Sequence, residues 1–403
     1  MASVRLDYDD AYTTRFEARV ASRGEHRGRP AVELEQTYFF PESGGQEADR
    51  GSIGATAVTD VQVEDGGRVW HVVEGAAPGA LDADTHEASL DWTRRFDHMQ
   101  QHTGQHILSA ALLRVIEAPT LSSHLGEERS SIEVQRPDVD WRTIERVEAA
   151  ANAVVWEDRA IERHWVDDEG ITRFQLRKPP QVSGRIRVVE IPDWDVSACG
   201  GTHTRRTGEV GVIKVVRWEK VRGNVRLEFL CGGRALADHA WRTEGMVEAA
   251  RRRTLKDREL LEHLERAAAE RDQWKKRAED LTKRVVEQEA RDRVGTPPRP
   301  LAGFHASRPR EELRWFALAA LAAGAPWVAV AAGAPEPVVI AGRARSGSLD
   351  LRELTPGLIE RAGGRGGGGA DLVQVAATDA GSAQRALEWI SAAIAERTGV
   401  PCP

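Results

Sequence analysis

The chain has 403 residues, which at roughly 150 residues per domain suggests two or three domains. Hydrophobic residues make up 41% of it and charged residues 30%, an ordinary globular composition with enough apolar surface for buried cores. The formal net charge of −7 argues, as a whole-chain sum, against a nucleic-acid partner. The three cysteines are an odd and sparse set, which argues against a disulfide framework and favours a reducing compartment.

We expect neither a targeting segment nor a membrane span. The first ten residues carry Asp7, Asp9 and Asp10 and no apolar run, so they do not resemble a signal peptide. The longest apolar stretch, residues 315–334, is interrupted by Pro326 and is expected to form a buried helix and a strand. The sequence therefore predicts a soluble, cytoplasmic protein without a membrane partner.

Residues 1–90 are expected to form a small antiparallel β-barrel. Apolar and polar side chains alternate in several short runs, and Gly66-Gly67 between two of them is typical of a hairpin turn. The same part contains Pro41-Glu-Ser-Gly-Gly-Gln46, followed by Asp49 and Gly51. Adjacent glycines allow a close approach of the backbone to another group, although a plain turn is the alternative interpretation.

Residues 91–235 mix helical and β-rich patterns and are expected to form an α+β domain. Apolar residues with helical spacing cover 93–115 and again 137–155. Residues 186–191 and 210–216 are rich in β-branched side chains, which predicts strands.

Residues 236–294 are highly charged and contain no proline. Their apolar residues step by three and four from Leu260 to Val285, with one gap at Arg271, which predicts a long amphipathic helix. We interpret it as an α-hairpin arm or a coiled coil; a solvated single helix is the plainer alternative.

Residues 301–403, after the linker Thr296-Pro-Pro-Arg-Pro300, are expected to form an α/β domain with strands at 327–332, 338–340 and 372–375 and a helix at 383–398. The run Gly363–Gly369 lacks the Gly-Lys-Ser/Thr ending of a P-loop. It is interpreted as a flexible loop or as a nest of backbone N–H groups for an anion or a chain terminus. The predicted fold class is thus α+β and multidomain.

Two motifs in residues 91–235 point to a metal. His102-Thr-Gly-Gln-His106 places two imidazoles on one helical face, and His98 extends that face by one turn. Cys199-Gly-Gly-Thr-His203 follows a predicted strand, and its glycines let the loop turn both ligand atoms toward one point. Together His102, His106, Cys199 and His203 supply a donor set that suits zinc.

The residues themselves leave the role of such a zinc open. Position 103 is Thr where a metallopeptidase places its catalytic Glu, which argues against peptide hydrolysis. Four ligands are typical of a closed structural site, whereas a catalytic zinc keeps one position open.

These motifs resemble a known family. The two metal motifs together resemble the editing domain shared by alanyl- and threonyl-tRNA synthetases, and Arg206-Thr-Gly-Glu-Val-Gly-Val-Ile-Lys214 with Gly223-Asn-Val-Arg-Leu-Glu228 is similar to its alanyl branch. The glycine motif that ends at Gln46 resembles that of the barrel preceding this domain. The glycine run with Asp371-Leu-Val-Gln374 resembles the DHHA1 type of C-terminal domain. The resemblance covers nearly the whole chain.

The resemblance implies a free-standing alanyl-tRNA editing protein of the large form, since a barrel expected from Met1 leaves no room for a synthetase catalytic core. It implies hydrolysis in trans of mischarged tRNA(Ala), chiefly Ser-tRNA(Ala) and also Gly-tRNA(Ala). A synthetase pocket for alanine discriminates poorly against either amino acid, because one small group supplies only about 1–3 kcal/mol. The ester is already activated, so zinc-associated water can suffice, and we assign no side-chain base.

The resemblance also implies residue roles. The hydroxyl of Thr103 is expected to read serine, although a hydrogen bond to its own helix is the alternative. Gly200 and Gly201 are expected beside the substrate. Position 104 is Gly where Ala is common, which costs helix stability by about 1 kcal/mol, and position 43 is Ser where Gly is common. Further pocket candidates are His98, Gln46 and His124 of Ser122-Ser-His-Leu-Gly126.

The expected partner is the acceptor end of tRNA(Ala). The net charge of −7 is a sum over the whole chain and hides a local cluster of basic residues. Binding through this cluster is expected to depend on salt. A homodimer through the helical arm or the C-terminal domain is a further expectation. The alternative function is a non-catalytic tRNA-binding or scaffolding protein with a structural zinc. The candidate tRNA contacts are Arg205, Arg206, Lys214, Arg217, Lys220 and Arg222.

Overall fold

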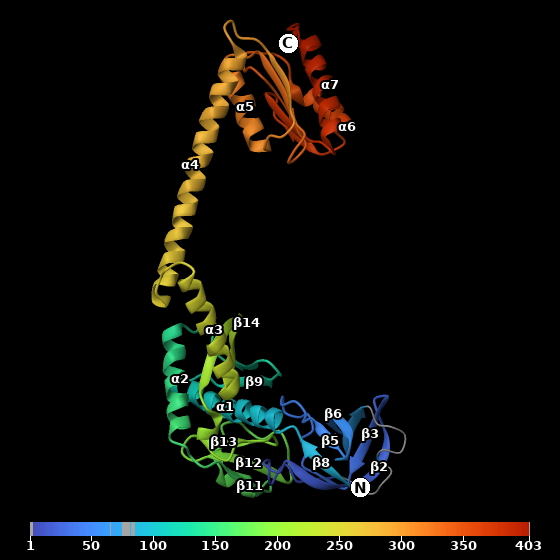
Figure 1. Ribbon diagram of the computed structural model, residues 1–403, viewed down its shortest axis with the longest axis vertical. Helices are drawn as coiled ribbons and strands as arrows, with labels where there is room; N and C mark the ends of the chain where they lie inside the picture. Colours follow the sequence, from blue (N-terminus) through green and yellow to red (C-terminus); the bar gives the residue numbers. More distant parts are fainter. Residues whose placement is uncertain (1–2, 65, 75–80, 82–84, 403) are drawn as a thin grey trace. The chain divides into compact units, whose positions relative to one another are not determined.

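The computed structural model describes residues 3–64, 66–74, 81 and 85–402. They fall into two compact units, Met1–Arg252 and Arg253–Pro403, and each unit is described by itself (Figure 1). The fold is mixed α/β and multidomain, as predicted. None of the helices in the described ranges is long and apolar enough to cross a membrane.

The first unit begins with six strands that close into a barrel, in the order β2-β3-β7-β6-β5-β8. Inward-facing side chains such as Leu34, Ile53 and Val61 are fully buried and form its core. Gly66 and Gly67, at the turn after β6, both have positive φ, as a tight hairpin turn requires; residue 65 lies outside the described residues. The strands are β1 (Val4–Arg5), β2 (Arg15–His26), β3 (Arg29–Leu34), β4 (Gln36–Thr37), β5 (Gly51–Ile53), β6 (Thr56–Val63), β7 (Val69–Glu74) and β8 (Thr85–Leu90), of which β1 pairs with β4 outside the barrel.

The rest of the first unit packs α1 (Trp92–Ile116) and α2 (Trp141–Trp156) against a sheet of order β14-β15-β10-β9. The predicted start of the second helix at residue 137 is wrong, because Asp140 caps the helix by accepting a hydrogen bond from the Thr143 amide at 2.8 Å. The strand predicted from residue 210 begins later, after a short 3-10 turn. A second sheet has the order β11-β12-β13. The strands are β9 (Thr120–Leu125), β10 (Ser130–Val134), β11 (Glu162–Val166), β12 (Ile186–Ile191), β13 (Asp195–Ala198), β14 (Ile213–Val221) and β15 (Asn224–Cys231).

The predicted long helix over residues 236–294 is interrupted. Helix α3 (Gly232–Arg251) ends before a non-helical segment in which Thr254 has a φ of 57°, a left-handed conformation that a β-branched residue does not adopt within a helix. Helix α4 (Leu260–Val294) then begins in the second unit.

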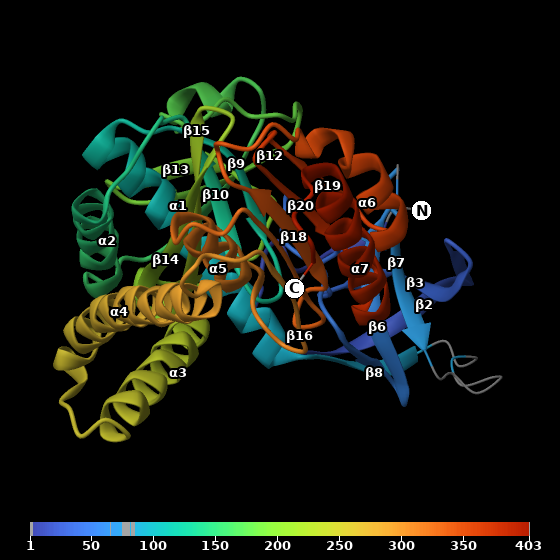
Figure 2. The same ribbon diagram turned by 90° about the horizontal axis from the view of Figure 1, so that it is seen from above.

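The second unit is built on a five-stranded sheet of order β16-β17-β18-β20-β19 with helices on both faces (Figure 2). Side chains of β17 alternate between the two cores: Trp327 packs with α6 and α7, whereas Val328 packs with α5 and the end of α4. This alternation makes both faces of the strand apolar, so it reads as a continuous hydrophobic run. The elements are β16 (Leu301–His305), α5 (Arg310–Ala322), β17 (Trp327–Ala332), β18 (Val338–Arg343), α6 (Thr355–Ala362), β19 (Gly366–Gly368), β20 (Leu372–Ala376) and α7 (Ala380–Thr398).

The glycine run of the second unit is neither the flexible loop nor the nest that the sequence suggested. Residues 366–368 form the edge strand β19, antiparallel to β20. A Cβ at Gly364, Gly366 or Gly368 would lie 2.0–2.2 Å from a carbonyl oxygen of β20 or of the residues around it. The glycines therefore serve a close approach of two backbones.

A buried histidine links two strands of the barrel. His71 on β7 is fully buried; its Nδ1 lies 3.1 Å from the Val32 carbonyl oxygen and its Nε2 lies 2.8 Å from the Thr37 hydroxyl. The carbonyl can only accept, so Nδ1 donates and Nε2 accepts from the hydroxyl, which is the neutral form of the ring. Burial lowers the pKa of His71 to about 4.

We predict that this histidine makes the first unit sensitive to acid. The unfolded state takes up a proton near pH 6.5 and the folded state only near pH 4, so stability is full above pH 6.5 and falls as the pH is lowered through that window. The loss attributable to His71 is about 3 kcal/mol. Chemical unfolding at several pH values measures it. His71→Gln is expected to flatten the pH dependence, whereas His239→Gln, at an exposed position on α3, is expected to leave it unchanged. An equal slope in both variants would contradict the assignment.

Candidate metal centre

Helix α1 carries the first two candidate ligands through the interior of the unit. Asp91 caps its beginning by accepting from the Arg94 amide at 3.1 Å, and Glu117 ends it in a left-handed conformation. Between them the helix is buried from Gln101 to Leu112 on all sides. His102 and His106 are therefore held four residues apart inside protein rather than on a solvated face.

The loop after β13 brings the other two ligands to the same place. Sγ of Cys199 lies 3.3 Å from Nε2 of His102 and 3.3 Å from Nε2 of His203. One ligand atom from each of His102, His106, Cys199 and His203 lies within 4.8 Å of every other. The structure thus brings together all four residues that the sequence singled out as ligands.

Each imidazole has its Nδ1 engaged by a different part of the unit. Nδ1 of His102 lies 2.7 Å from Oε1 of Gln46, and Nδ1 of His106 lies 2.9 Å from Oδ2 of Asp195. Nδ1 of His203 lies 3.2 Å from the hydroxyl oxygen of Thr103. With Nδ1 as the donor, each ring in its neutral form keeps a lone pair on Nε2 for a metal at the centre.

The electrostatics of the cluster favour ligand forms. Burial by itself would raise the pKa of the Cys199 thiol, but the imidazoles of His102 and His203 outweigh burial and lower that pKa well below its usual value. Burial, then the charge on His102, lower the pKa of His203 well below its usual value. A thiolate beside a neutral imidazole is the protonation state in which both bind a metal.

His106 is the exception in this cluster. Burial opposes its protonation, but the hydrogen bonds to Asp195 and Cys199 outweigh burial and raise the pKa of His106 to about 9. Burial would likewise raise the pKa of Asp195, yet His106 and then Arg177 lower it to about 2. A proton on His106 therefore balances the thiolate, and a cation at the centre would take over that balance.

The donor set fits zinc on distance as well as on chemistry. Tetrahedral zinc with usual bond lengths separates a bound sulfur and a bound nitrogen by roughly 3.5 Å. The two sulfur–nitrogen distances of 3.3 Å are close to that value. Three imidazoles and one thiolate are also softer ligands than magnesium or calcium prefers.

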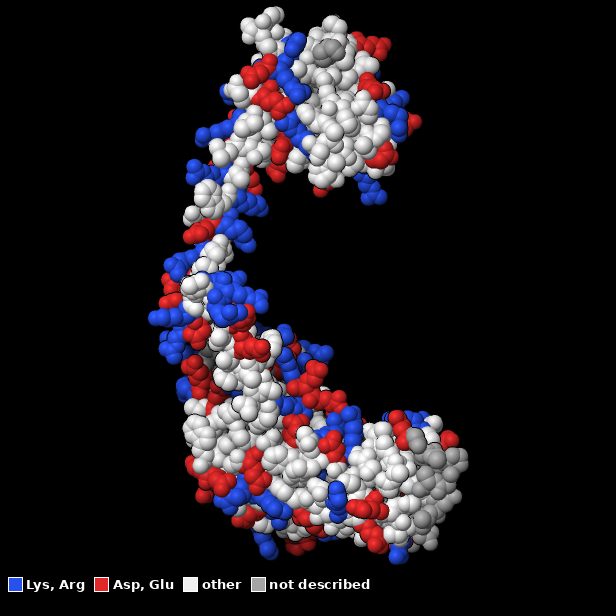
Figure 3. Space-filling model, viewed as in Figure 1, with Lys and Arg blue, Asp and Glu red and all other residues white. Residues whose placement is uncertain are grey.

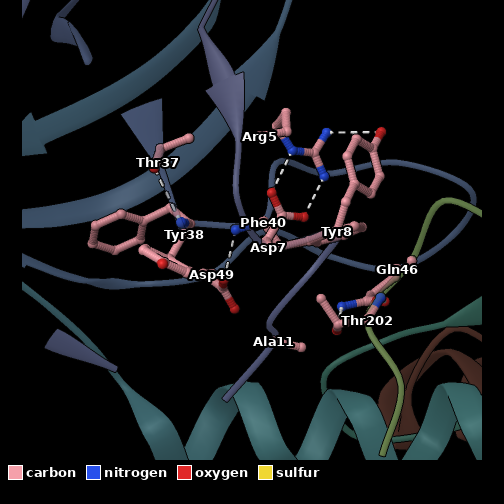
Figure 4. Close-up of polar contacts among 12 residues, drawn as sticks. Arg5, Asp7, Tyr8, Ala11, Thr37, Tyr38, Phe40, Gln46, Asp49 and Thr202 are labelled. Atoms are coloured by element: carbon pink, nitrogen blue, oxygen red, sulfur yellow. Dashed lines mark hydrogen bonds and ion pairs between the residues drawn. The ribbon is translucent and has the colours of Figure 1, made fainter. Parts of the chain in front are cut away.

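The glycine motif of the N-terminal segment contacts the centre through Gln46. This side chain is fully buried, and its amide nitrogen donates to the Thr202 hydroxyl at 2.8 Å while its oxygen accepts from the Thr202 amide (Figure 4). The same oxygen faces His102, so one amide joins a ligand of α1 to the ligand loop. Gln46, which the sequence suggested as a pocket residue, thus contacts the ligand His102 and the ligand loop, and its pocket role stays a prediction.

An ion pair fixes this segment to the start of α1. Arg95 is fully buried and binds the Asp49 carboxylate, the Ala11 carbonyl and the Tyr38 carbonyl. Asp49 also accepts from the Phe40 amide at 2.6 Å (Figure 4). A buried charge left without its partner is strongly destabilising, so positions of α1 that separate Arg95 from Asp49 are disfavoured.

The two loop glycines differ in what surrounds them. A Cβ at Gly201 would lie 2.1 Å from a ring carbon of His102, so only glycine lets that imidazole reach its place. A Cβ at Gly200 would meet nothing closer than 3.7 Å, at the ring of Tyr8. The space beside Gly201 is therefore filled by the imidazole of His102, whereas Gly200 is exposed at the edge of the centre.

The sheet β11-β12-β13 supports the ligand loop with residues that the sequence analysis missed. Arg163 of β11 donates to the carbonyl of His203 at 3.0 Å, and Arg187 of β12 donates to the carbonyls of Cys199 and Gly201 at 3.0 and 2.9 Å. Asp195 of β13 is the partner of His106. The available signal was Asp195 itself, an acidic residue four positions before Cys199, at the start of the strand that leads into the ligand loop.

The remaining pocket candidates lie as follows. Thr103 is fully buried; besides facing His203, its hydroxyl oxygen accepts from the Thr204 amide at 3.1 Å. His98 is buried one turn before His102 and outside the ligand group; burial and then Arg94 lower its pKa to about 4. His124 on β9 is exposed.

Gly104 has a packing reason in this structure. A Cβ at this position would lie 2.2 Å from Sγ of Cys231, a fully buried thiol on β15. Burial raises the pKa of Cys231 and keeps it a neutral thiol. The departure from Ala at position 104 therefore accommodates the Cys231 side chain.

The predicted tRNA-binding cations are largely paired within the unit. Arg205 and Arg206 follow the ligand loop, whereas the others lie on β14 or at the turn after it. Paired carboxylates weaken the field that a phosphate would meet. Within 4.0 Å lie the pairs Arg205–Asp10, Arg206–Asp158, Lys214–Glu148, Arg217–Glu219 and Lys220–Asp138.

Comparison with known proteins agrees with this picture. Residues 186–228 match the family described as "Threonyl and Alanyl tRNA synthetase second additional domain". The alanyl-tRNA editing protein AlaX-L of Pyrococcus horikoshii is 35% identical over 239 residues, 58% of this chain and 59% of that protein. The alanine–tRNA ligase of Pyrococcus abyssi is 35% identical over 298 residues, 70% of this chain and 31% of the ligase. The chain thus spans about three fifths of the first relative and a third of the second.

We predict that Asp195→Asn weakens metal binding by about 10–100-fold, because Nδ1 of His106 loses a charged acceptor. Competition with a chromophoric chelator measures the affinity. Asp193→Asn is the matched control: Asp193 is exposed, two residues away, and its φ of 58° suits asparagine. Equal affinities of the two variants would contradict the role of Asp195.

We predict that Gly104→Ala lowers the free energy of unfolding by about 1–3 kcal/mol, since overpacking against Cys231 exceeds the gain in helix propensity. In a Cys231→Ala background the same change is expected to be neutral or stabilising. Chemical unfolding of the four proteins measures the coupling. Additive effects would show that the thiol is not the obstacle.

Proposed function

This chain is a relative of the alanyl-tRNA editing proteins, and on that premise we propose that it hydrolyses the aminoacyl ester of mischarged tRNA(Ala). The expected substrates are chiefly Ser-tRNA(Ala) and also Gly-tRNA(Ala), attacked in trans, and the expected compartment is the cytoplasm. The observation that carries the proposal is the convergence of His102, His106, Cys199 and His203 on one point.

The open side of the centre supports a catalytic rather than a sealed site. The three histidines are buried, but Cys199 is half-buried and Gly200 next to it is exposed. A substrate would therefore approach along Cys199. Bound zinc would supply a Lewis acid that polarises the ester carbonyl or water beside it.

The protein groups around the centre bind and orient. Gln46, Asp195 and Thr103 hold the three imidazoles, which keeps the ligand atoms in place before a substrate arrives. Arg187 is buried, and among the described residues its Nε and Nη2 have no hydrogen-bond partner. A ligand oxygen that reached them would satisfy two donors that are otherwise costly to bury.

Two proposed contacts with the substrate involve groups that already have a partner within the protein. We keep Thr103 as the residue that reads serine, although its hydroxyl oxygen already faces His203 and the Thr204 amide. We also keep contacts of the Arg205–Arg222 segment with the acceptor end of tRNA. In both cases the substrate must compete with an existing partner, so the gain from each contact is modest.

A second copy of this chain is the partner that we propose for α4. The helix leaves a stripe of apolar side chains exposed, among them Leu264, Trp274, Leu281 and Val285. Together with Ala267, Arg271 and Ala278 between them, they follow the steps of three and four that define positions a and d of a coiled coil. Acidic and basic side chains intersperse with uncharged ones along this helix (Figure 3).

The order of the stripe favours an antiparallel pair. When the two helices run in opposite directions about a point between Asp272 and Gln273, Leu264 of one copy faces Leu281 of the other. Ala267 then faces Ala278, and Arg271, the gap in the stripe, faces the Trp274 ring as a cation–π contact. Glu270 of each copy then lies beside Arg277 of the other, and the two-fold symmetry makes this contact twice. A parallel pair would instead set Arg271 against Arg271.

The alternative function, a non-catalytic tRNA-binding or scaffolding protein with structural zinc, is favoured by the closed set of four ligands. The two proposals differ in what removal of Cys199 does. A purely structural metal predicts unfolding, whereas a catalytic one predicts a folded but inactive protein.

We predict that the purified protein deacylates Ser-tRNA(Ala) and spares Ala-tRNA(Ala), and that Cys199→Ala abolishes the activity while the fold persists. Release of the labelled amino acid and circular dichroism are the two measurements. Gly200→Ala is the matched control and is expected to retain zinc binding, because its Cβ meets no close atom. Equal rates on both tRNAs would refute the specificity, and no hydrolysis by zinc-loaded protein would leave the non-catalytic alternative.

We predict that Leu281→Glu dissociates a dimer into monomers, because it places a charge in the seam, whereas Lys283→Glu on the opposite face of α4 does not. Sedimentation over a range of concentrations measures the mass. In a Cys402→Ser background, a mixture of Ala267→Cys and Ala278→Cys chains is expected to cross-link more readily than either alone. A wild type that is monomeric at every concentration would refute the dimer, and preferential cross-linking of each variant to itself would refute the antiparallel order.

A further inference from the structure

The two faces of the sheet β11-β12-β13 carry different side chains. One face carries Arg163, Arg187 and Asp195, which hold the ligand loop and His106. Because side chains alternate along a strand, Glu162 and His164 of β11 point to the other face. Glu190 of β12, directly opposite Glu162, shares that second face.

These three residues form a cluster in which two carboxylates face one imidazole. Glu162 and Glu190 are register partners, and like charges directly opposite on a strand pair are destabilising. Both carboxylates point at the same atom: Nε2 of His164 lies 3.5 Å from Oε2 of Glu162 and 3.2 Å from Oε2 of Glu190. Within the described part of the chain, no lysine or arginine forms an ion pair with either glutamate.

Nε2 of His164 is itself unsatisfied. The atom is buried from solvent and has no hydrogen bond of acceptable geometry with any described residue. One ring nitrogen has at most one proton, so it cannot serve two carboxylates at once. The ring is also restrained by Phe174, whose centroid lies 5.2 Å away. A nitrogen lone pair and two carboxylate oxygens around one point are an arrangement that a cation completes.

We propose that Glu162, His164 and Glu190 form a second metal site, which binds a divalent first-row transition ion such as Zn²⁺. Nε2 of His164 lies 3.5 and 3.2 Å from the two carboxylate oxygens, close to the separation of roughly 3.4 Å between two ligand atoms on tetrahedral zinc. The exposed side of the cluster leaves room for water as the remaining ligand, so the site is weaker than the Cys/His centre.

The site would act as a clip between two strands. Glu162 and His164 belong to β11 and Glu190 to β12, so a shared ion fixes the register of this pair. The same register places Arg163 and Arg187 on the opposite face, where both hold the ligand loop. Metal on the outer face would therefore stabilise the platform of the first centre. The proposal does not depend on the proposed function.

Zinc stoichiometry at equilibrium tests the proposal. The full chain, dialysed against buffered micromolar free Zn²⁺, is expected to hold two equivalents of zinc. His164→Gln and Glu190→Gln are each expected to hold one. His26→Gln is the matched control and should hold two, because His26 contacts a single carboxylate, Glu64, at 3.2 Å.

Thermal unfolding supplies a second readout. Added Zn²⁺ beyond the first equivalent is expected to raise the melting temperature of the wild type and of His26→Gln, but not that of His164→Gln. If His164→Gln does not fold, Glu162→Gln, at the exposed end of β11, gives the same comparison. A wild type that holds no more zinc than a folded His164→Gln under the same conditions would overturn the second site.

Discussion

The structure of the first unit depends on one arrangement: three buried imidazoles are each held through Nδ1 so that their ligand atoms meet the Cys199 sulfur at one point. His102, His106 and His203 are all buried at one point, and each has its Nδ1 engaged by a different residue. This arrangement leaves the three Nε2 atoms close to the Cys199 sulfur, which also accepts a hydrogen bond from the Gly201 amide at 3.5 Å. A cluster with so many lone pairs is stable only with a cation or a proton at its centre.

The partners of the three imidazoles explain why the unit needs all its parts. Gln46 comes from the segment between barrel strands, Asp195 from a small sheet, and Thr103 from α1 itself. The ion pair of Arg95 with Asp49 fixes the first of these segments to α1, and Arg163 and Arg187 fix the ligand loop to the second. The barrel is therefore part of the centre rather than an appendage.

The charged side chains of the first unit are also mostly held by partners within it. Among the basic residues after the ligand loop, Arg206, Lys214 and Lys220 are each paired with a carboxylate, which weakens the field that a phosphate would meet there. An acidic chain that binds tRNA through a few contacts would show an affinity that falls only gently as salt rises, because the slope scales with the number of phosphate contacts. The outer face of the small sheet shows the opposite case, where two carboxylates share one imidazole.

A His pair at i, i+4 and a Cys/His pair on a glycine loop define their chemistry locally, so the donor set can be recognised from the sequence. The sequence also determined the mixed α/β class, because hydrophobic periodicity is a local property. The residues that hydrogen-bond to the ligands depend on the tertiary structure, because Gln46 is 56 positions from His102 and Asp195 is 89 positions from His106. The tertiary structure likewise decided the break between α3 and α4, the strand made by Gly366–Gly368 and the need for Gly104 beside Cys231. Each of these depends on atoms brought together by folding, which no local pattern records.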